Sequence, residues 1–476
     1  MSTENILQLT KGLRILIVGS GARENAIIKS LFRSKYKPLI FCFGNTRNPD
    51  ILLKSANFRL GDINSPAQVT AFALENKIDI ALVGPENPSE AGVGDELLRS
   101  GIRIVSPTKE QAKLEWSKTF TRDLLTKYNI DGSPMYKAFN TMDGVEDFIN
   151  TMGTKFVIKA DGLCGGKGVQ VQDDHFVTIQ EGLKFCKEII DAKGSFLIEQ
   201  KLEGQEFSYF ALCDGQNIQF LSPIIQDHKR AYEGDEGPNT GGMGTYSDSN
   251  HLLPFLNDDD KVEAENITKA VFEAMKSEGV GFVGVMYGGF MKTRNGVKLI
   301  EYNARFGDPE CENLMSLLET DLVEILVNMA NKTLDTINIK FSPKASVCKY
   351  LVPIGYPNKP IKNEAIDISR LFVEGDIEEN WESIFFGSVD ETEVVNSDVG
   401  DFESEEYVDD ESEEPVIMLK GSRAIAVCCV GDDISEAEAK VEDIIGLIDG
   451  PMFHRSDIGK VDYVATKVEM MKNILR

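Results

Sequence analysis

The chain has 476 residues, of which 42% are hydrophobic and 41 are glycine, and at roughly 150 residues per domain this length predicts about three α/β domains. Its formal net charge of −27 argues against a nucleic acid or an anionic membrane surface as a partner. No segment approaches the ~20 consecutive apolar residues that span a bilayer, and the N-terminus lacks the basic start and apolar core of a secretory signal.

The first predicted element is a buried strand at 14–18, followed by the turn Gly19-Ser20-Gly21 and a helix that begins near Arg23. Further strands are predicted at 39–43, 78–83 and 103–105, with helical stretches between them. Such alternation predicts a doubly wound parallel sheet over residues 1–112. A dinucleotide fingerprint is excluded, because its third glycine would fall on Glu24. The glycines either place a phosphate or ribose at the helix N-terminus or only shape a tight turn.

The second predicted domain covers 113–341, and about 135–200 of it form a lid subdomain. It opens with one helix from Lys113 that carries Ser117, Lys118 and Arg122. The strands are predicted at 155–159, 169–171, 195–200, 207–213, 284–292 and 297–302, and further helices at 261–277 and 320–329.

A glycine-rich loop, Ala160–Gly168, joins two of these strands. A P-loop has four residues between its first glycine and Gly-Lys, continues with Ser or Thr, and opens a helix, so this loop is not one. We expect a flexible hairpin that closes over a triphosphate, with backbone N–H groups and with Lys159 and Lys167 as charge partners. A glycine-rich hairpin without a ligand is the alternative.

Two other polar segments are candidate binding elements. Residues 198–206 carry an acid near each end, a pattern that suits an adenine edge and ribose hydroxyls but is more often only solvated. Residues 226–244 form a long predicted loop with both signs of charge and five glycines, a type of loop that is usually functional or disordered. Its 240–244 core can bring backbone donors to an acyl phosphate or carboxylate, and His228 is given no catalytic role.

The segment LIEYNARFGDPE, residues 299–310, combines strand residues with hard ligands. Because side chains two apart share a strand face, Glu301, Asn303 and Arg305 are expected to point the same way. Carboxylate and amide oxygens suit magnesium, which leaves its other positions to phosphates and water. Arg305 can then hold an anion through forked hydrogen bonds. A strand end with solvated polar residues is the alternative.

The third predicted domain covers 342–476, with strands at 346–352 and 424–430 and a helix at 435–448. Residues 371–414 contain eighteen Asp or Glu and no Lys or Arg. We expect an acidic insertion at about 390–415 to be a solvated or disordered excursion, with a docking site as the alternative. The eight cysteines are scattered without a C-x-x-C pair, which favours free thiols and a cytoplasmic location.

Taken in order, several motifs resemble the phosphoribosylamine–glycine ligase family, or glycinamide ribonucleotide synthetases, of the ATP-grasp superfamily. They are KLEWSKTFTRDLL, KADGLCGGKGV, IEQKLEGQE, QDHKR with GPNTGGMG, and EYNARFGDPE. The resemblance runs from about Arg14 to Asp457. It implies an α/β ATP-grasp fold with an N-terminal doubly wound parallel-sheet domain, a mobile lid subdomain and a small C-terminal domain.

The family's reaction is a step of de novo purine synthesis. ATP phosphorylates glycine to glycyl phosphate, which the amine of 5-phosphoribosylamine attacks, giving glycinamide ribonucleotide, ADP and phosphate. The resemblance therefore implies ATP and Mg²⁺ (or Mn²⁺) as cofactors and glycine and 5-phosphoribosylamine as small-molecule partners. We expect no nucleic acid or membrane partner and a monomeric chain.

By position, the resemblance also implies residue roles. Glu301 and Asn303 match the metal ligands, and the catalytic residues are Lys159, Asp227 and Arg305. The ATP-binding positions are Lys118, Lys159, Gly165, Gly166, Lys167, Glu199, Leu202 and Glu206. The substrate-binding positions are Gly21, Arg23, Glu24, Asn45, Glu86, Asp227, Lys229, Thr240, Gly241, Gly242 and Arg305.

Two departures from the family pattern lie in the first domain, where the resemblance places phosphoribosylamine. Asn25 stands where the family's G-N-G-G-R-E-H-A has histidine, and Phe43–Asn48 replaces its P-G-N-A-G-T turn. A ligase with a different amine acceptor is therefore one alternative. A nucleotide-binding protein that has lost catalysis is another, and the retained metal and phosphate residues argue against it.

Overall fold

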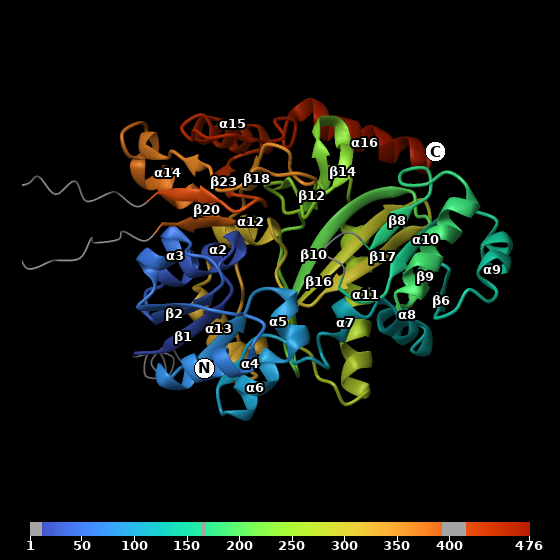
Figure 1. The fold of residues 1–476 in the computed structure, drawn as a ribbon, viewed down its shortest axis with the longest axis horizontal. Helices are drawn as coiled ribbons and strands as arrows, with labels where there is room; N and C mark the ends of the chain where they lie inside the picture. The colour runs from blue at the N-terminus through green and yellow to red at the C-terminus, as the bar shows by residue number, and fades with distance from the viewer. Residues whose placement is uncertain (1–11, 164–167, 393–415) are drawn as a thin grey trace, which may run out of the picture.

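The N-terminal part of the chain is built on a parallel sheet. The computed structural model in Figure 1 describes residues 12–163, 168–392 and 416–476. The sheet has the order β3-β2-β1-β4-β5, and all its neighbours run parallel. Its strands are β1 (Arg14–Val18), β2 (Leu39–Gly44), β3 (Asn57–Leu60), β4 (Ile80–Val83) and β5 (Arg103–Ile104). Its helices are α2 (Ala22–Phe32), α3 (Pro49–Lys54), α4 (Pro66–Glu75), α5 (Glu86–Ala91) and α6 (Val93–Arg99).

Alternate residues of β1 point to two different cores, as expected for a doubly wound sheet. Leu16 and Val18 pack with α4 and α6. Ile15 and Ile17 belong to a core that continues into α12 (Glu310–Leu317) and α13 (Leu322–Ala330). The parallel sheet predicted from the sequence is confirmed. The edge strand β3 was not predicted, because its side chains are only half-buried and carry no hydrophobic run.

The lid region has an antiparallel sheet of order β6-β9-β7-β8 with its own apolar core. Its elements are β6 (Tyr136–Phe139), α9 (Val145–Met152), β7 (Phe156–Ala160), β8 (Val169–Val171), α10 (Ile179–Asp191) and β9 (Phe196–Gln200). The prediction of a single helix from Lys113 is wrong, because α7 (Lys113–Trp116) is followed by a separate helix, α8 (Lys118–Lys127). Ser117 between them has an extended backbone, and its side chain caps the N-terminus of α8.

The long central sheet has the order β11-β10-β16-β17 and lies beside the lid (Figure 1). It consists of β10 (Gly204–Asp214), β11 (Ile218–Phe220), β16 (Val283–Thr293) and β17 (Gly296–Asn303), and α11 (Asp258–Ser277) packs on it. A β-bulge interrupts the β16–β17 pairing: Phe290 pairs with Leu299, but Gly289 pairs with Glu301, so Ile300 is the extra residue.

Another sheet mixes segments from the middle and the end of the chain, in the order β12-β15-β18-β23-β20 with β24 beside β18. The expected long loop at 226–244 is wrong in part, because it contains short strands. These are β12 (Gln226–Asp227), β13 (Arg230–Tyr232) and β14 (Glu236–Asn239), and β15 (Gly244–Ser247) follows. The C-terminal strands are β18 (Ala345–Pro353), β20 (Ile384–Phe386), β23 (Ile425–Gly431) and β24 (Met452–Phe453).

Smaller elements complete the C-terminal region. They are β19 (Ala365–Ile366), α14 (Ile377–Ser383), β21 (Val389–Glu391), β22 (Ile417–Leu419), α15 (Ile434–Ile445) and α16 (Val461–Leu475). Much of the predicted acidic insertion, 393–415, lies outside the described residues. The seven cysteines within the described ranges are buried free thiols. Across those ranges, no helix combines the length and apolar character needed to cross a membrane.

Candidate active site

The lid meets the central sheet through a buried ion cluster. Glu199 on β9 accepts from Arg122 Nε at 2.7 Å and Nη2 at 3.1 Å, and its Oε2 lies 2.8 Å from Lys159 Nζ. Burial by itself would raise the pKa of Glu199, but the two cations outweigh it and lower the pKa to about 2. The β-bulge presents the Ile300 carbonyl to the same cations, at 2.9 Å from Lys159 Nζ and 2.8 Å from Arg122 Nη2.

One of the two predicted metal residues, Glu301, lines a pocket on the central sheet. Glu301 borders this pocket with Glu206, Asp227, Lys229 and Tyr287, among others. Burial would raise the pKa of Glu301, but four surrounding cations, those of Lys229, Lys159, Lys118 and Arg305, lower it. The carboxylate is therefore ionised and sits where positive charge is concentrated.

Asn303 lies two residues along the same strand, and its Oδ1 accepts from Arg305 Nη2 at 3.3 Å. An ionised carboxylate and an amide oxygen on one strand are a suitable donor pair for Mg²⁺ that shares its coordination with phosphates and water. No group of three or more His, Cys, Asp or Glu side chains that could enclose a metal occurs in the described ranges. A metal at Glu301 and Asn303 would thus depend on non-protein ligands, as the donor set implies.

Lys118 stands at the first turn of α8 and reaches the glycine-rich loop. Its Nζ donates to the Gly162 carbonyl at 3.0 Å, and its backbone N–H donates to Asp161 Oδ1 at 2.7 Å. Of the predicted nucleotide residues on this loop, Gly165, Gly166 and Lys167 lie outside the described residues. Leu202 is half-buried between β9 and β10.

Two residues of the pocket connect the nucleotide side to the 226–244 segment. Glu206 Oε2 lies 3.6 Å from Lys229 Nζ, and the pKa of Lys229 is raised first by Glu206 and also by Glu301. The Lys229 carbonyl accepts from the backbone N–H of Thr240 at 2.7 Å and from its hydroxyl at 2.9 Å. Lys229 and Thr240 are therefore fixed to each other at the two ends of one hairpin.

Asp227 is half-buried and lines the same pocket. Its Oδ1 has no hydrogen-bond partner among the described residues. Burial raises the pKa of Asp227 well above the ordinary value, and nearby Glu310 adds to the effect. Glu310 itself is buried, and its Oε1 accepts from Ser208 Oγ at 3.0 Å and Tyr287 Oη at 2.5 Å. The orphaned Asp227 oxygen can accept from a ligand ammonium group.

Arg305 joins the end of β17 to the first domain. Its Nε donates to Glu86 Oε2 at 2.9 Å, and its Nη2 lies 3.0 Å from Glu115 Oε1. The pKa of Glu86 is lowered to about 2, chiefly by Arg305. The expected fork on an anion is thus formed with two protein carboxylates. Arg305 Nη1 and Arg23 Nη1 both donate to the Phe306 carbonyl, at 3.1 and 3.2 Å.

The predicted first-domain residues gather where the parallel strands end, an edge at which doubly wound sheets bind ligands. Gly21 follows β1, Asn45 follows β2, and Glu86 follows β4. Arg23 Nε pairs with Glu24 Oε1 at 2.7 Å, and Glu24 Oε2 accepts from the Gly21 N–H at 2.8 Å. The Asn45 N–H donates to Ser20 Oγ at 3.1 Å, and the Asn45 side chain is exposed.

Asn25, the departure from the family pattern, does not face this edge. Its Nδ2 donates to Asp50 Oδ2 at 2.6 Å, and its Oδ1 accepts from the Phe386 N–H at 2.9 Å. Asn25 is fully buried. Its side chain therefore holds the first domain against β20 of the C-terminal region.

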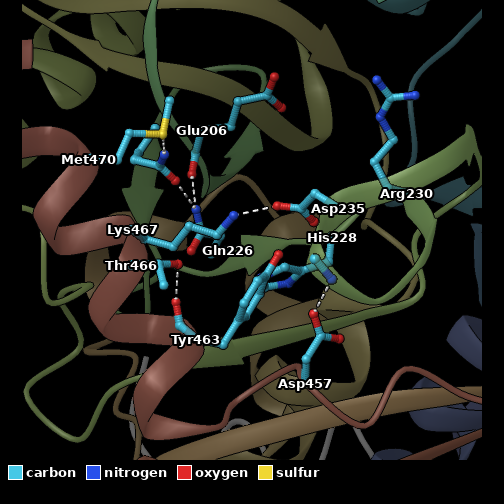
Figure 2. A network of polar contacts seen from close by, with 12 residues as sticks. Glu206, Gln226, His228, Arg230, Asp235, Asp457, Tyr463, Thr466, Lys467 and Met470 are labelled. Carbon is cyan, nitrogen blue, oxygen red and sulfur yellow. Dashed lines mark hydrogen bonds and ion pairs between the residues drawn. The ribbon is translucent and has the colours of Figure 1, made fainter.

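The hairpin β13–β14 is anchored by the end of the chain (Figure 2). Asp235 at its tip pairs with Lys467 on α16 and with Arg455 Nη1, which lies 2.9 Å from Asp235 Oδ1. Figure 2 shows Lys467 and Tyr463 on α16 pointing toward Asp235. Farther along the helix, Met470 Sδ accepts from Gln205 Nε2 at 2.8 Å, beside Glu206.

Several residues of this site were not predicted as functional from the sequence. Arg122, Glu115, Asp161, Asp308, Glu310 and Arg423 all contact predicted site residues or the segments that carry them. Asp308 and Glu310 belong to the EYNARFGDPE motif, so their place in this motif is the sequence signal that points to them. Arg423 lies more than a hundred residues away in sequence and had no comparable signal.

The chain matches known proteins along most of its length. Three family models cover it: phosphoribosylglycinamide synthetase N domain at residues 13–115, ATP-grasp (A) domain at 116–311 and C domain at 346–461. The phosphoribosylamine–glycine ligase of Methanobrevibacter smithii is 42% identical over 97% of this chain and all of its own length. That of Methanocaldococcus jannaschii is 40% identical over 98% of this chain, again over its full length.

Solved structures agree with these matches. The crystal structure of phosphoribosylamine–glycine ligase from Thermotoga maritima superposes with a TM-score of 0.73 at 26% identity, covering 94% of this chain and all of that one. Biotin carboxylase from Campylobacter jejuni gives a TM-score of 0.66 at 13% identity, covering 98% of this chain and 96% of its own. The second likeness concerns the fold alone.

Proposed function

This chain belongs to the phosphoribosylglycinamide synthetase family, and on that premise we propose how its residues carry out the ligase reaction. The chain is an ATP-dependent phosphoribosylamine–glycine ligase of purine biosynthesis. It joins glycine to 5-phosphoribosylamine and forms glycinamide ribonucleotide, ADP and phosphate. The single observation that carries the residue assignments is Glu301, an ionised carboxylate surrounded by four cationic side chains.

The reaction proceeds in two displacements. A glycine carboxylate oxygen attacks the γ-phosphorus of ATP, the bond to the β-phosphate oxygen breaks, and ADP leaves glycyl phosphate behind. The phosphoribosylamine nitrogen then attacks the acyl carbon, phosphate departs, and the nitrogen loses a proton. Neither displacement needs a protein nucleophile, so the protein's contribution is positioning and charge neutralisation.

Lys118 and Lys159 are the proposed contacts for the ATP phosphates, together with Gly165, Gly166 and Lys167 of the loop. Lys159 is held ready by Glu199 and the Ile300 carbonyl. Glu199, Leu202 and Glu206 are the proposed contacts for adenosine. Of these, Glu206 is exposed, and its carboxylate can meet ribose hydroxyls beside its ion pair with Lys229, whereas Glu199 is held by its two cations.

Glu301 and Asn303 are the proposed ligands of Mg²⁺, with Mn²⁺ as an alternative ion. When bound, the ion would neutralise charge on the ATP phosphates. Glu301 supplies an ionised oxygen because its cationic neighbours keep its pKa low despite burial. Asn303 is oriented by Arg305, whose guanidinium is itself fixed by Glu86 and Glu115.

Glycine is proposed to lie over Asp227, whose unpartnered Oδ1 accepts from its ammonium group. Lys229, Thr240, Gly241, Gly242 and Arg305 surround the glycyl group. Phosphoribosylamine is assigned to Gly21, Arg23, Glu24, Asn45 and Glu86 at the strand ends of the first domain. Asn25, which departs from the family pattern, bonds to Asp50 and Phe386 and holds the domains together. Its side chain therefore takes no part in the proposed phosphoribosylamine site, which supports this assignment.

We further propose that the protein is monomeric and cytoplasmic. Supporting the second proposal, the described cysteines are free thiols, which suits a reducing compartment. The oligomeric state is measured by light scattering of the purified protein, where a mass near 52.7 kDa corresponds to one chain.

One assay tests the reaction: ADP release with glycine and Mg²⁺, with and without freshly generated phosphoribosylamine. The proposal requires ADP release to depend on phosphoribosylamine and glycinamide ribonucleotide to accumulate. Release that depends on another amine would assign a different acceptor. Absence of turnover with every amine would favour a nucleotide-binding protein.

A further inference from the structure

Arg423 lies just before β23 in the C-terminal region, but its guanidinium reaches the active site. Nη1 donates to the Gly241 carbonyl at 2.7 Å, the Asp308 carbonyl at 2.7 Å and the Gly242 carbonyl at 3.1 Å. Nη2 lies 3.2 Å from Asp308 Oδ1. One side chain thus links three carbonyls and a carboxylate from two separate segments.

The guanidinium is itself held in place. Its Cζ lies 4.6 Å from the centre of the Tyr350 ring, within the range of a cation–π contact. The Tyr350 hydroxyl donates to Asp308 Oδ1 at 2.6 Å, so Arg423 and Tyr350 converge on the same carboxylate. The Tyr350 N–H donates to the Met243 carbonyl at 2.9 Å, directly after the glycine turn. The Arg423 side chain is only 16% exposed.

The two segments bridged by Arg423 enclose Asp227. Gly242 has φ +115°, and a Cβ on it would lie 2.7 Å from Asp227 Oδ1 and 2.9 Å from Pro309 Cδ. The glycine turn, the Asp227 carboxyl and the Asp308-Pro309 segment are therefore in direct contact. Asp227 Oδ1, which has no partner in the described part of the chain, lies between them. A shift of either bridged segment changes the space around this oxygen.

We propose that Arg423 is a positioning residue for the amino-acid substrate: it clamps the Gly241-Gly242 turn and Asp308 on either side of Asp227. The C-terminal region thereby sets the affinity for glycine, whereas the phosphate side of the pocket is set by Lys118, Lys159 and Glu301. The proposal rests on the assignment of glycine to Asp227. Arg423 itself does not touch the reacting atoms.

The test is a comparison of Michaelis constants in Arg423→Met, which keeps the stem of the side chain and removes every donor. The KM for glycine should rise about tenfold, the effect of losing charge-assisted hydrogen bonds around the binding group. The KM for ATP should stay within about twofold of the wild type. Arg423→Lys should raise the glycine KM by an intermediate factor, because an ammonium keeps the charge but cannot fork across both segments.

The matched control is Arg370→Met, which removes an arginine of the same region from an exposed pair with Glu374. It should leave both KM values unchanged. Thermal unfolding of each variant, read by circular dichroism, verifies the fold. If Arg423→Met does not fold, Arg423→Lys decides, because a glycine KM that rises severalfold with an unchanged ATP KM still supports the proposal.

The outcomes separate this proposal from the one on which it rests. A wild-type enzyme without glycine-dependent turnover would remove the assigned function. A wild-type enzyme with normal turnover and an Arg423→Met variant whose glycine KM is unchanged would overturn only the role of Arg423. Equal increases in the KM for glycine and for ATP would also overturn it, since they would indicate a general structural effect.

Discussion

Lys159 Nζ lies 2.8 Å from Glu199 Oε2, a diagonal contact between neighbouring strands of the lid. Lys159 is a proposed phosphate contact. Because of its pair with Glu199, its ammonium group is partly occupied before any nucleotide binds. Arg122 holds both oxygens of Glu199 from the other side. Because of Arg122, Glu199 stays charge-compensated when Lys159 turns toward a phosphate, and the lid does not expose an unpaired buried carboxylate.

We expect Glu199→Gln to destabilise the protein by about 3 kcal/mol at neutral pH, because it leaves Arg122 and Lys159 buried without a counter-charge. The folded-state pKa of Glu199 is about 2, below its ordinary 4.5. A depressed carboxyl pKa contributes stability above the unfolded value, and this contribution is lost as pH falls toward the folded value. Urea unfolding from pH 7 down to the acid range should therefore show the gap between wild type and variant narrowing below about pH 4.5. A constant gap would contradict the ion cluster, and the exposed Glu374→Gln serves as control.

Glu301→Ala should lower kcat by about 100-fold or more, because the site loses the ionised carboxylate proposed as a metal ligand. The fold should persist, since Glu301 borders a pocket rather than the apolar core. Steady-state ADP release at saturating Mg²⁺ and ATP measures the effect. Glu273→Ala on α11, which removes an exposed acid paired with Lys276, is the control. Near-normal turnover in Glu301→Ala would show that the metal lies elsewhere.

Asp227→Asn should raise the KM for glycine by about 100-fold, because an ammonium group would lose its charged acceptor. Burial and Glu310 raise the pKa of Asp227. At a pH above the ordinary pKa of an Asp side chain, part of the wild-type protein therefore still carries a neutral Asp227 carboxyl. Proton loss then creates the binding form, and the wild-type glycine KM should decrease as pH rises above about 4. The same measurements on Asp227→Asn should give no such decrease. A pH profile shared by both proteins would rule out Asp227 as the titrating group.

Gly242→Ala should both destabilise the chain and weaken glycine binding. The added Cβ would meet Asp227 Oδ1 at 2.7 Å, and φ +115° is unfavourable for an L residue. Together these cost about 1–3 kcal/mol. Gly234→Ala is a matched control in the same segment, 226–244, with φ +71° and no atom within 4 Å of its Cβ. It should cost only about 1 kcal/mol and leave the glycine KM unchanged. Identical effects of the two substitutions on the KM would refute the tight packing around Asp227.

The parts of the fold that depend on local pattern could be predicted from the sequence. The strand 14–18 is found at β1 with the same bounds, and the pair 284–292 and 297–302 matches β16 and β17 closely. Strict alternation fails at Ile300, because the β-bulge places Leu299 and Tyr302 in the core although they are three residues apart. Ile300 is half-buried and lines the pocket.

Contacts over long sequence separations could not be predicted from one sequence. The sequence indicates that Glu199 lies at the polar end of a strand. Its pairing with Arg122, however, depends on how α8 packs against the lid. Within 226–244, β13 and β14 pair with each other, and β12 pairs with β15, which in turn pairs with β18. A run that looked like a loop is therefore ordered by tertiary partners. The role of Asn25 likewise requires β20, more than three hundred residues away.

The anchoring of Asp235 by Arg455 and Lys467 has a consequence for how the enzyme matures on the ribosome. The ATP-grasp residues leave the exit tunnel long before the segment that carries these two cations. Until almost the entire polypeptide has been made, the hairpin with Lys229 lacks the partners that hold it in place. A nascent chain interrupted before α16 would therefore lack Lys467, one of the two cations that pair with Asp235.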